Sequence, residues 1–392
     1  MEASLAANPI RTSTAVTKSH TEPVGGGIVR QFTLADIPVI SEWMEDASNF
    51  FHRYDEHSAT SHLLDQYVVA TTSDPHGLFT LQKYFLVYEK ADRIHACVGI
   101  SHKRGGSTKI GPFLLAPEAP KGSRIRIAMT VARAAVDDAR RLGRRKVYAT
   151  VSASNVGFFK ILEAFGGACE AKLSNQYQEG SDETVWALRL DDTNEAAAGS
   201  VVTSALGVPE EKFEATAVSP YGNSDKAFLE GQFATLAEWH SDVDETFTDA
   251  MVSAHARGRN GTRLDFQEKC AAIFVARQSG RPVGLTIATR KRGGALKAYP
   301  LFGSRDVQTA LLSALHKVGR ENRCRKLYTY CHETDSRQYE WLTSMGFRSC
   351  GLIRAPYKAG HNLFFFECAL DELGNRLSTA PAVTQQAESI AA

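Results

Sequence analysis

The residues best suited to proton transfer gather in one polar stretch near the start of the chain. Residues 50–55 (FFHRYD) mix aromatic and ionisable side chains, as a substrate-binding loop can. Histidine titrates near neutral pH, so this stretch could supply a general base. The candidates here are Glu45, Asp46, His52, Asp55, Glu56 and His57, and two others are His102 at a predicted strand edge and Ser152 at a strand end. The alternative interpretation is that this stretch is a partly exposed loop with no catalytic role.

A basic loop further along could bind a phosphate group. Lys121, Gly122, Ser123, Arg124 and Arg126 surround the start of a predicted helix, residues 125–142. A helix N-terminus offers unpaired N–H donors and a positive dipole to an anion. Three cations and a glycine at this place suit a pyrophosphate. The alternative is a solvated basic loop.

Two short sequence patterns recur in the same order in the two halves of the chain. Residues 103–112 (KRGGSTKIGP) and 291–300 (KRGGALKAYP) share the pattern KRGGxxKxxP. A second echo follows each copy, RKVY at 145–148 and RKLY at 325–328. Matches in the same order predict a duplicated domain. We expect each glycine pair to form a tight turn with solvated charges, and a basic lip that selects an acidic or phosphorylated substrate is the functional alternative.

Both halves carry one predicted order of elements, β-α-(α)-β-β-β-α-β-α-β-β, which places the chain in the α/β class with mixed sheets. A chain of 392 residues also suits two domains of ordinary size. The expected division is a disordered lead at 1–27, a first domain at 28–190, a linker at 191–208, a second domain at 209–372 and a disordered tail at 373–392.

Composition argues against several classes of partner. The formal net charge is +1, so no global field draws the chain to nucleic acid or to an anionic membrane. No apolar run approaches the roughly 20 residues that cross a bilayer. Seven scattered cysteines without a CxxC pair indicate a reducing compartment and argue against a structural zinc site. We therefore expect a cytoplasmic protein that uses no metal, membrane or nucleic acid.

The order of elements closely resembles that of the GNAT superfamily of N-acyltransferases. Residues 155–167 (NVGFFKILEAFGG) match the family's spacing from Asn to Gly. The resemblance implies two tandem GNAT-like domains, each with a mostly antiparallel mixed sheet, flanking helices and two splayed parallel strands. It also implies acetyl-CoA or another acyl-CoA as cosubstrate between those strands. The implied contacts to the cosubstrate are Phe113, Leu114, Leu115, Lys121, Gly122, Ser123, Arg124, Arg126, Asn155 and Phe159.

The second half departs from the family's pattern. The segment between its proline and RKLY is eight residues shorter than in the first half, which removes the phosphate loop. Asp306 would lie near the helix N-terminus, where it repels phosphate, and Asp335 stands at the family's Asn position. We therefore expect acyl-CoA in the first domain, with the second domain as a scaffold or as a wall of the acceptor pocket.

The resemblance implies direct acyl transfer to the amine of a small molecule or peptide, by a monomer or homodimer, and places the polar stretch near the acceptor. The family's usual tyrosine, which protonates the leaving thiolate, is Leu162 in the first half and Leu342 in the second. The acid must therefore come from elsewhere. Three alternatives stay open: an inactive binding or scaffold protein, a donor on a carrier protein or aminoacyl-tRNA, and an active C-terminal copy.

Overall fold

The computed structural model describes residues 26–47, 80–119, 121–191, 215–241, 243–244, 246–265 and 268–379. The first half consists of β1 (Ile28–Gln31), α1 (Ile37–Ala47), β2 (Thr80–Lys90), β3 (Arg93–Lys103), β4 (Ser107–Leu115), α3 (Lys121–Arg141), β5 (Lys146–Ser152), α4 (Val156–Ala164), β6 (Ala168–Gln178) and β7 (Ser181–Arg189). The second half consists of β8 (Thr216–Pro220), α5 (Lys226–Ala237), α6 (Phe247–Arg257), β9 (Ala272–Gln278), β10 (Arg281–Lys291), β11 (Ala295–Phe302), α7 (Arg305–Glu321), β12 (Lys326–His332), α8 (Ser336–Ser344), β13 (Arg348–Ile353), β14 (Leu363–Ala369) and α9 (Leu370–Thr379).

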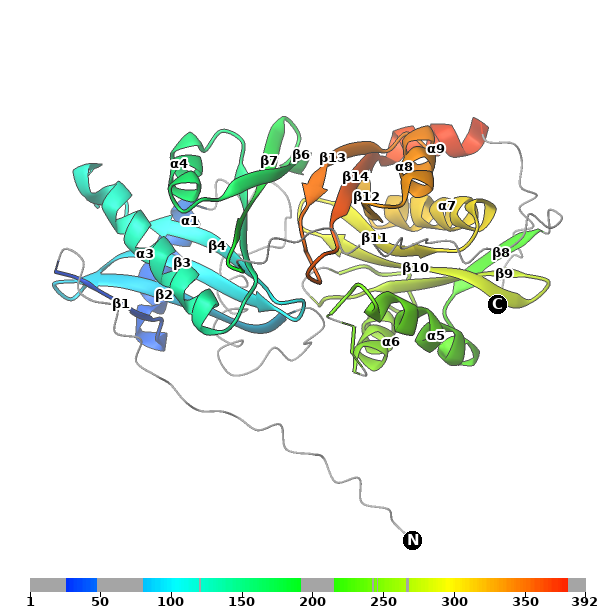
Figure 1. Cartoon of the computed structure of the whole chain (residues 1–392), viewed down its shortest axis with the longest axis horizontal. Helices are drawn as coiled ribbons and strands as arrows, with labels where there is room; N and C mark the ends of the chain where they lie inside the picture. Colours follow the sequence, from blue (N-terminus) through cyan, green and yellow to red (C-terminus); the bar gives the residue numbers. More distant parts are fainter. Residues whose placement is uncertain are drawn as a thin grey trace, which may run out of the picture.

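The described strands form one sheet in the order β1-β2-β3-β4-β5-β7-β6-β13-β14-β12-β11-β10-β9-β8. Read from its outer edge, the second half repeats the strand order of the first. Helices cover both faces, as Figure 1 shows for α5 and α6 against α7, α8 and α9. The predicted α/β class, with a mostly antiparallel mixed sheet and flanking helices in each half, is confirmed.

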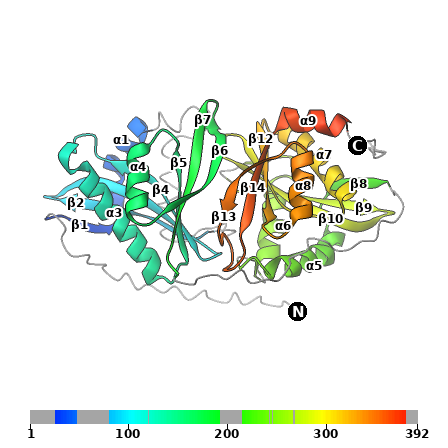
Figure 2. The same cartoon turned by 45° about the horizontal axis from the view of Figure 1, so that its top comes forward.

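The two halves share their sheet, which the sequence did not predict. Strands β6 and β13 pair antiparallel at Ala171 and Gly351, and they lie side by side in Figures 1 and 2. Gly351 has φ +144°, and a Cβ there would lie 2.1 Å from the backbone oxygen of Glu170. Glycine therefore permits the close approach of the two strands.

Each half contains one parallel pair of strands that separates along its length. Strands β4 and β5 pair only from Ser107–Lys146 to Lys109–Tyr148, although both continue beyond these residues. Strands β11 and β12 separate in the same way after Lys297. The splayed parallel strands that the family resemblance implied are thus present in both halves.

The core explains why helices cover both faces of the first half. On β2, Tyr84 and Leu86 pack in one apolar cluster with residues of α3, whereas Phe85 and Val87 pack in another with residues of α1. Side chains alternate along a strand, so a run that is apolar on both faces needs cover on both. This arrangement holds α3 on one face and α1 on the other.

The predicted start of the disordered tail, residue 373, is wrong, because this residue lies within a helix. Residues 370–379 form α9, in which Leu370 and Leu373 are buried against α7. The apolar residues recur at helical spacing, so the segment can bury one face and gain the free energy that orders it. Most of the expected lead and linker lies outside the described residues. None of the helices among the described residues is long and apolar enough to span a bilayer.

Candidate active site

A cavity of about 1990 Å³ lies where the two halves meet. Its lining comes from β2 to β5, α3, α4, β6 and β7 of the first half, and from α6 and β10 to β14 of the second. Because both α3 and residues on the opposite face of the sheet line it, the cavity passes between the splayed strands β4 and β5.

One end of the cavity is an apolar groove between α3 and α4. Phe113 and Phe158 line it with their ring centroids 5.2 Å apart and tilted by 58°. Ile125 on α3 and Val156 on α4 also line it, with 72% and 57% of their surfaces exposed. Large apolar side chains left open to solvent along a groove favour an apolar ligand chain.

The N-terminus of α3 lies beside this groove and carries no acidic residue in its first turn. The Arg124 guanidinium lines the cavity and braces the preceding loop, because its Nε donates to the oxygen of Ala119 at 2.9 Å and its Nη2 to that of Pro117 at 2.5 Å. The first-turn N–H groups and the helix dipole suit an anion there.

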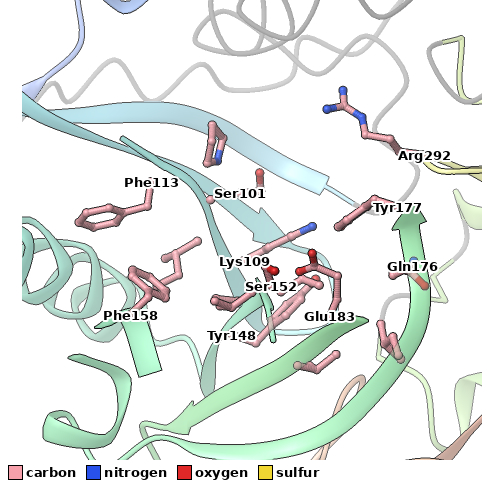
Figure 3. A pocket seen from close by; sticks show the side chains of 18 of the residues that line it. Ser101, Lys109, Phe113, Tyr148, Ser152, Phe158, Gln176, Tyr177, Glu183 and Arg292 are labelled. Carbon is pink, nitrogen blue, oxygen red and sulfur yellow. The ribbon is translucent and has the colours of Figure 1, made fainter. Parts of the chain in front are cut away.

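The middle of the cavity brings ionisable and hydroxyl groups together, as Figure 3 shows for Lys109, Tyr148, Ser152 and Glu183. Lys109 is the register partner of Tyr148 across β4 and β5, and Ser152 is that of Glu183 across β5 and β7. Glu183 is 7% exposed. Burial raises the pKa of Glu183 to about 7, although the charge of Lys109 acts against this shift.

The other end of the cavity is cationic. Lys103 comes from the first half and Lys291 from the second, and the charge of Lys109, in the middle of the cavity, acts on both. Burial, and then the charges of Lys109, Lys83, Lys291 and Lys269, hold the pKa of Lys103 well below its usual value. Arg292 lies at this end in Figure 3, opposite Phe113 and Phe158. The cavity therefore changes from apolar to lysine-rich along its length.

The two KRGG hairpins form the predicted tight turns, and each turn packs against the other half. A Cβ at Gly105 would lie 3.2 Å from the Cα of Tyr357, and one at Gly293 would lie 2.5 Å from the oxygen of Gln176. Arg104 donates to Asp244 across the same boundary at 2.9 Å. The charged side chains of the hairpins thus lie at the junction and along the cavity, and not only in solvent.

The corresponding splay in the second half is filled by its own side chains. Gln308 stands as far before Arg325 as Ala128 stands before Arg145, and it is 3% exposed. Its amide donates to the oxygens of Leu301 and Gly303 at 3.2 and 3.0 Å. The buried Trp341 stands at the α8 position that Ile161 occupies in α4. In the first half the smaller Ala128 and Ile161 line the cavity instead.

Six of the predicted site residues line the cavity: Phe113, Leu114, Leu115, Arg124, Ser152 and Asn155. The Asn155 side chain caps α4 by accepting the N–H of Phe158 at 3.2 Å. Gly122, Ser123 and the exposed Arg126 are not among the described lining residues, and the Lys121 side chain lies outside the description. The polar stretch with His52, Asp55, Glu56 and His57 also lies outside the described residues.

Two predicted placements are corrected. His102 is fully buried in the middle of the sheet, within 2.8 Å of the Tyr84 hydroxyl and 2.9 Å of the Thr108 hydroxyl. It faces α3, because its neighbours Ser101 and Lys103 take the cavity side of β3. Phe159 stacks on Trp186 at 5.2 Å, and the next residue towards the N-terminus, Phe158, faces the cavity.

Sequence reasoning missed Glu183 and Tyr148 as site residues. Tyr148 carried a signal, since it belongs to the repeated RKVY echo. Glu183 carried none, because a single glutamate on a strand acquires a role only through its register partner and its burial. Lys103 and Lys291 were visible as repeated residues, but their convergence was not.

No protein-family model and no curated protein matches the sequence. Similar solved structures include a spermidine N-acetyltransferase from Vibrio cholerae in complex with CoA and spermine, with 18% identity, a TM-score of 0.34 and coverage of 42% of this chain and 96% of that one. A ribosomal-protein-alanine N-acetyltransferase from Brucella melitensis has 18% identity, a TM-score of 0.35 and coverage of 41% and 99%. An N-acetyltransferase from Staphylococcus aureus has 16% identity, a TM-score of 0.34 and coverage of 42% and 99%.

Proposed function

We propose that the chain is an acyl-CoA-dependent N-acyltransferase whose first half binds the acyl donor. The observation that carries the proposal is the contrast between the two splays. The first is open and lined by apolar side chains, and the second is closed by Gln308 and Trp341. A duplicated arrangement with one open copy supports one donor site.

The residues of the first splay fit the parts of an acyl-CoA. The groove between Phe113 and Phe158 suits an extended, largely apolar chain such as pantetheine. The N-terminus of α3, with no acid in its first turn, suits a diphosphate. In the second half, Asp306 in the first turn of α7 opposes that use. Acetyl-CoA is the donor that we propose.

Glu183 is the group that we assign as the general base. Its pKa of about 7 lets it accept a proton from an ammonium or an attacking amine near neutral pH. The amine nitrogen then bonds to the acyl carbon, the carbon–sulfur bond breaks, and the thiolate takes up a proton. The hydroxyl groups of Tyr148 and Ser152 face the same part of the cavity and can donate to the sulfur. They would replace the tyrosine that the family usually carries at the position of Leu162.

The second half contributes to the acceptor side of the cavity in this proposal. Lys291 and Tyr357 line the cavity beyond the splay, where an acceptor amine would approach the acyl group from the side opposite α3. This supports the second half as a wall of the acceptor pocket rather than a second donor site.

The test is calorimetric titration of acetyl-CoA into the full chain and two variants. Ile125→Glu places a carboxylate in the groove beside the α3 N-terminus and should weaken binding at least tenfold. Leu34→Glu, at a residue 68% exposed that does not line the cavity, should leave binding unchanged.

The outcomes separate the alternatives. Saturable binding followed by transfer of a radiolabelled acetyl group to amines in a panel supports the transferase. Binding without transfer to any amine would instead identify a non-catalytic acyl-CoA-binding protein. Absence of binding to the folded wild type would refute acyl-CoA as the donor and direct the search to acyl groups on a carrier protein or tRNA.

A further inference from the structure

Positive charge is concentrated in the cavity far beyond its share of the chain. The described lining residues include eight lysines, of which Lys146 is paired with Glu170 outside the lining, and three arginines, but one carboxylate, that of Glu183. The whole chain has 45 basic and 44 acidic residues. A balanced chain that places its lysines around one cavity creates a local field for anions.

The lysines come from separate strands and from both halves. Lys103 ends β3, Lys109 lies on β4 and Lys291 ends β10. Burial comes first among the causes that lower the pKa of Lys103, and the charges of Lys109 and Lys291 add to it. Burial, and then the charges of Lys297, Lys109 and Lys269, lower the pKa of Lys291 to about 7. Grouping cations in this way opposes folding, because each must lose water near charges of its own sign.

This cationic end is separate from the proposed donor groove. Lys103 shares the cavity side of β3 with Ser101, on the face opposite α3. The groove lined by Phe113 and Phe158 lies at the other end (Figure 3). Glu183 and Tyr148 stand between the two ends. A ligand held by the lysines would therefore present its other end to the reacting centre.

We propose that the acceptor is an amine that carries a phosphate or polycarboxylate group, and that Lys103, Lys109 and Lys291 bind this anionic group across the junction of the two halves. The proposal rests on the proposed transferase function for the word acceptor, whereas the anion site follows from the lysines alone. A multiply charged anion would offset the like charges of these three lysines, which the two halves bring together.

The test is calorimetric titration of sodium pyrophosphate and of sodium citrate into the full chain at pH 7 and low salt. Lys103→Gln and Lys291→Gln should each weaken pyrophosphate or citrate binding at least tenfold. Lys317→Gln, at an exposed lysine of α7 outside the cavity, is the matched control and should change binding less than twofold. Tighter binding of pyrophosphate supports a phosphorylated amine, and tighter binding of citrate supports a polycarboxylate.

Two further measurements make the inference falsifiable. The first is thermal unfolding, in which Lys103→Gln and Lys291→Gln should each have a Tm at or above that of the wild type, because each substitution removes a like charge. Loss of anion binding together with a lower Tm would assign these lysines a structural role and overturn the inference. Acetyl-CoA affinity should change less than threefold in both variants. Equal loss of acetyl-CoA and pyrophosphate binding would show that the lysines hold the donor's own phosphates and would also overturn it.

The same titrations separate this inference from the proposed function. Lysine-dependent pyrophosphate binding by a wild type that does not bind acetyl-CoA would support the anion site and refute the transferase. Acetyl-CoA binding with no saturable binding of pyrophosphate or citrate would leave the transferase standing and overturn the anion site.

Discussion

At the scale of single residues, the chemistry of the cavity depends on which groups are buried together. Glu183 and Lys291 are an acid and a base of ordinary type, yet burial brings both pKa values to about 7. Each can therefore change its charge near neutral pH. Glu183 is the one whose place beside Ser152 and Tyr148 suits proton transfer at the reacting centre.

Glu183→Gln should lower kcat by about 10²-fold or more while acetyl-CoA affinity stays unchanged, because the amide cannot accept the proton. In the wild type, kcat/KM should rise with pH through an apparent pKa of about 7, since the carboxylate is the active form. Glu179→Gln, at the exposed turn after β6, is the control. A Glu183→Gln enzyme that keeps the rate and pH profile of the wild type would refute the assignment.

The same substitution has a distinct effect on stability. Glu183 has a folded-state pKa above its unfolded value, so the folded state binds a proton that the unfolded state has released. The buried carboxylate consequently destabilises the fold as pH rises from about 4.5 to 7 and fully above 7. We expect Glu183→Gln to raise Tm at pH 8 and to raise it less at pH 4, measured by thermal unfolding.

At the scale of elements, the hairpins decide how the halves fit. Their turns contain glycines with positive φ, and a Cβ added at Gly293, which has φ +78°, would meet the backbone of Gln176 and Tyr177. Arg325 braces the same turn by donating to the oxygen of Gly293 at 2.6 Å and to that of Asn175 at 2.9 Å. A turn chosen for its backbone shape thereby becomes part of the junction.

Gly293→Ala should destabilise the chain by two separable effects. The left-handed backbone opposes any L side chain by about 1–2 kcal/mol, and the clash at 2.5 Å from the oxygen of Gln176 adds about 1–3 kcal/mol. Gly180→Ala is the matched control, because Gly180 has φ +77° and a Cβ added there would meet nothing within 4 Å. Urea unfolding of both variants measures the difference, and equal losses would show that the junction yields without cost.

At the scale of the whole molecule, reciprocal contacts join the halves into one unit. The lysines of the repeated RKVY and RKLY sequences each donate a hydrogen bond to the backbone of the other half. Lys146 donates to the oxygen of Arg354 at 2.7 Å, and Lys326 donates to that of Ser174 at 2.7 Å. Each lysine is also paired with a buried glutamate, Glu170 at 2.5 Å and Glu367 at 2.8 Å. Separating the halves would expose these charges and the β6 edge.

Glu170→Gln should therefore destabilise the full chain by about 3–5 kcal/mol, because it leaves the ammonium group of Lys146 buried without its counter-charge. Lys172→Gln removes the ion pair of a lysine whose own side chain is 63% exposed. This substitution should lower the free energy of unfolding by less than about 1 kcal/mol. Urea unfolding measures both. The wild type should unfold in one transition, and two separated transitions would contradict a single unit.

The sequence by itself determined the features that neighbouring residues encode. The apolar periodicity and the tight KRGG turns depend on residues a few positions apart, and they predict the elements and their order in both halves. The resemblance in the order of elements then implied the splayed strands and the place of Phe113 in the cavity lining.

Only the tertiary structure decided what those elements do together. The orientation of α4 places Phe158 rather than Phe159 in the cavity lining, and the alternation of side chains along β3 places His102 in the core. Register placed Glu183 opposite Ser152, and Gln308 closed the second splay. These outcomes depend on close packing and charge between segments far apart in the chain, where a shift of one residue reverses which side chain meets the cavity.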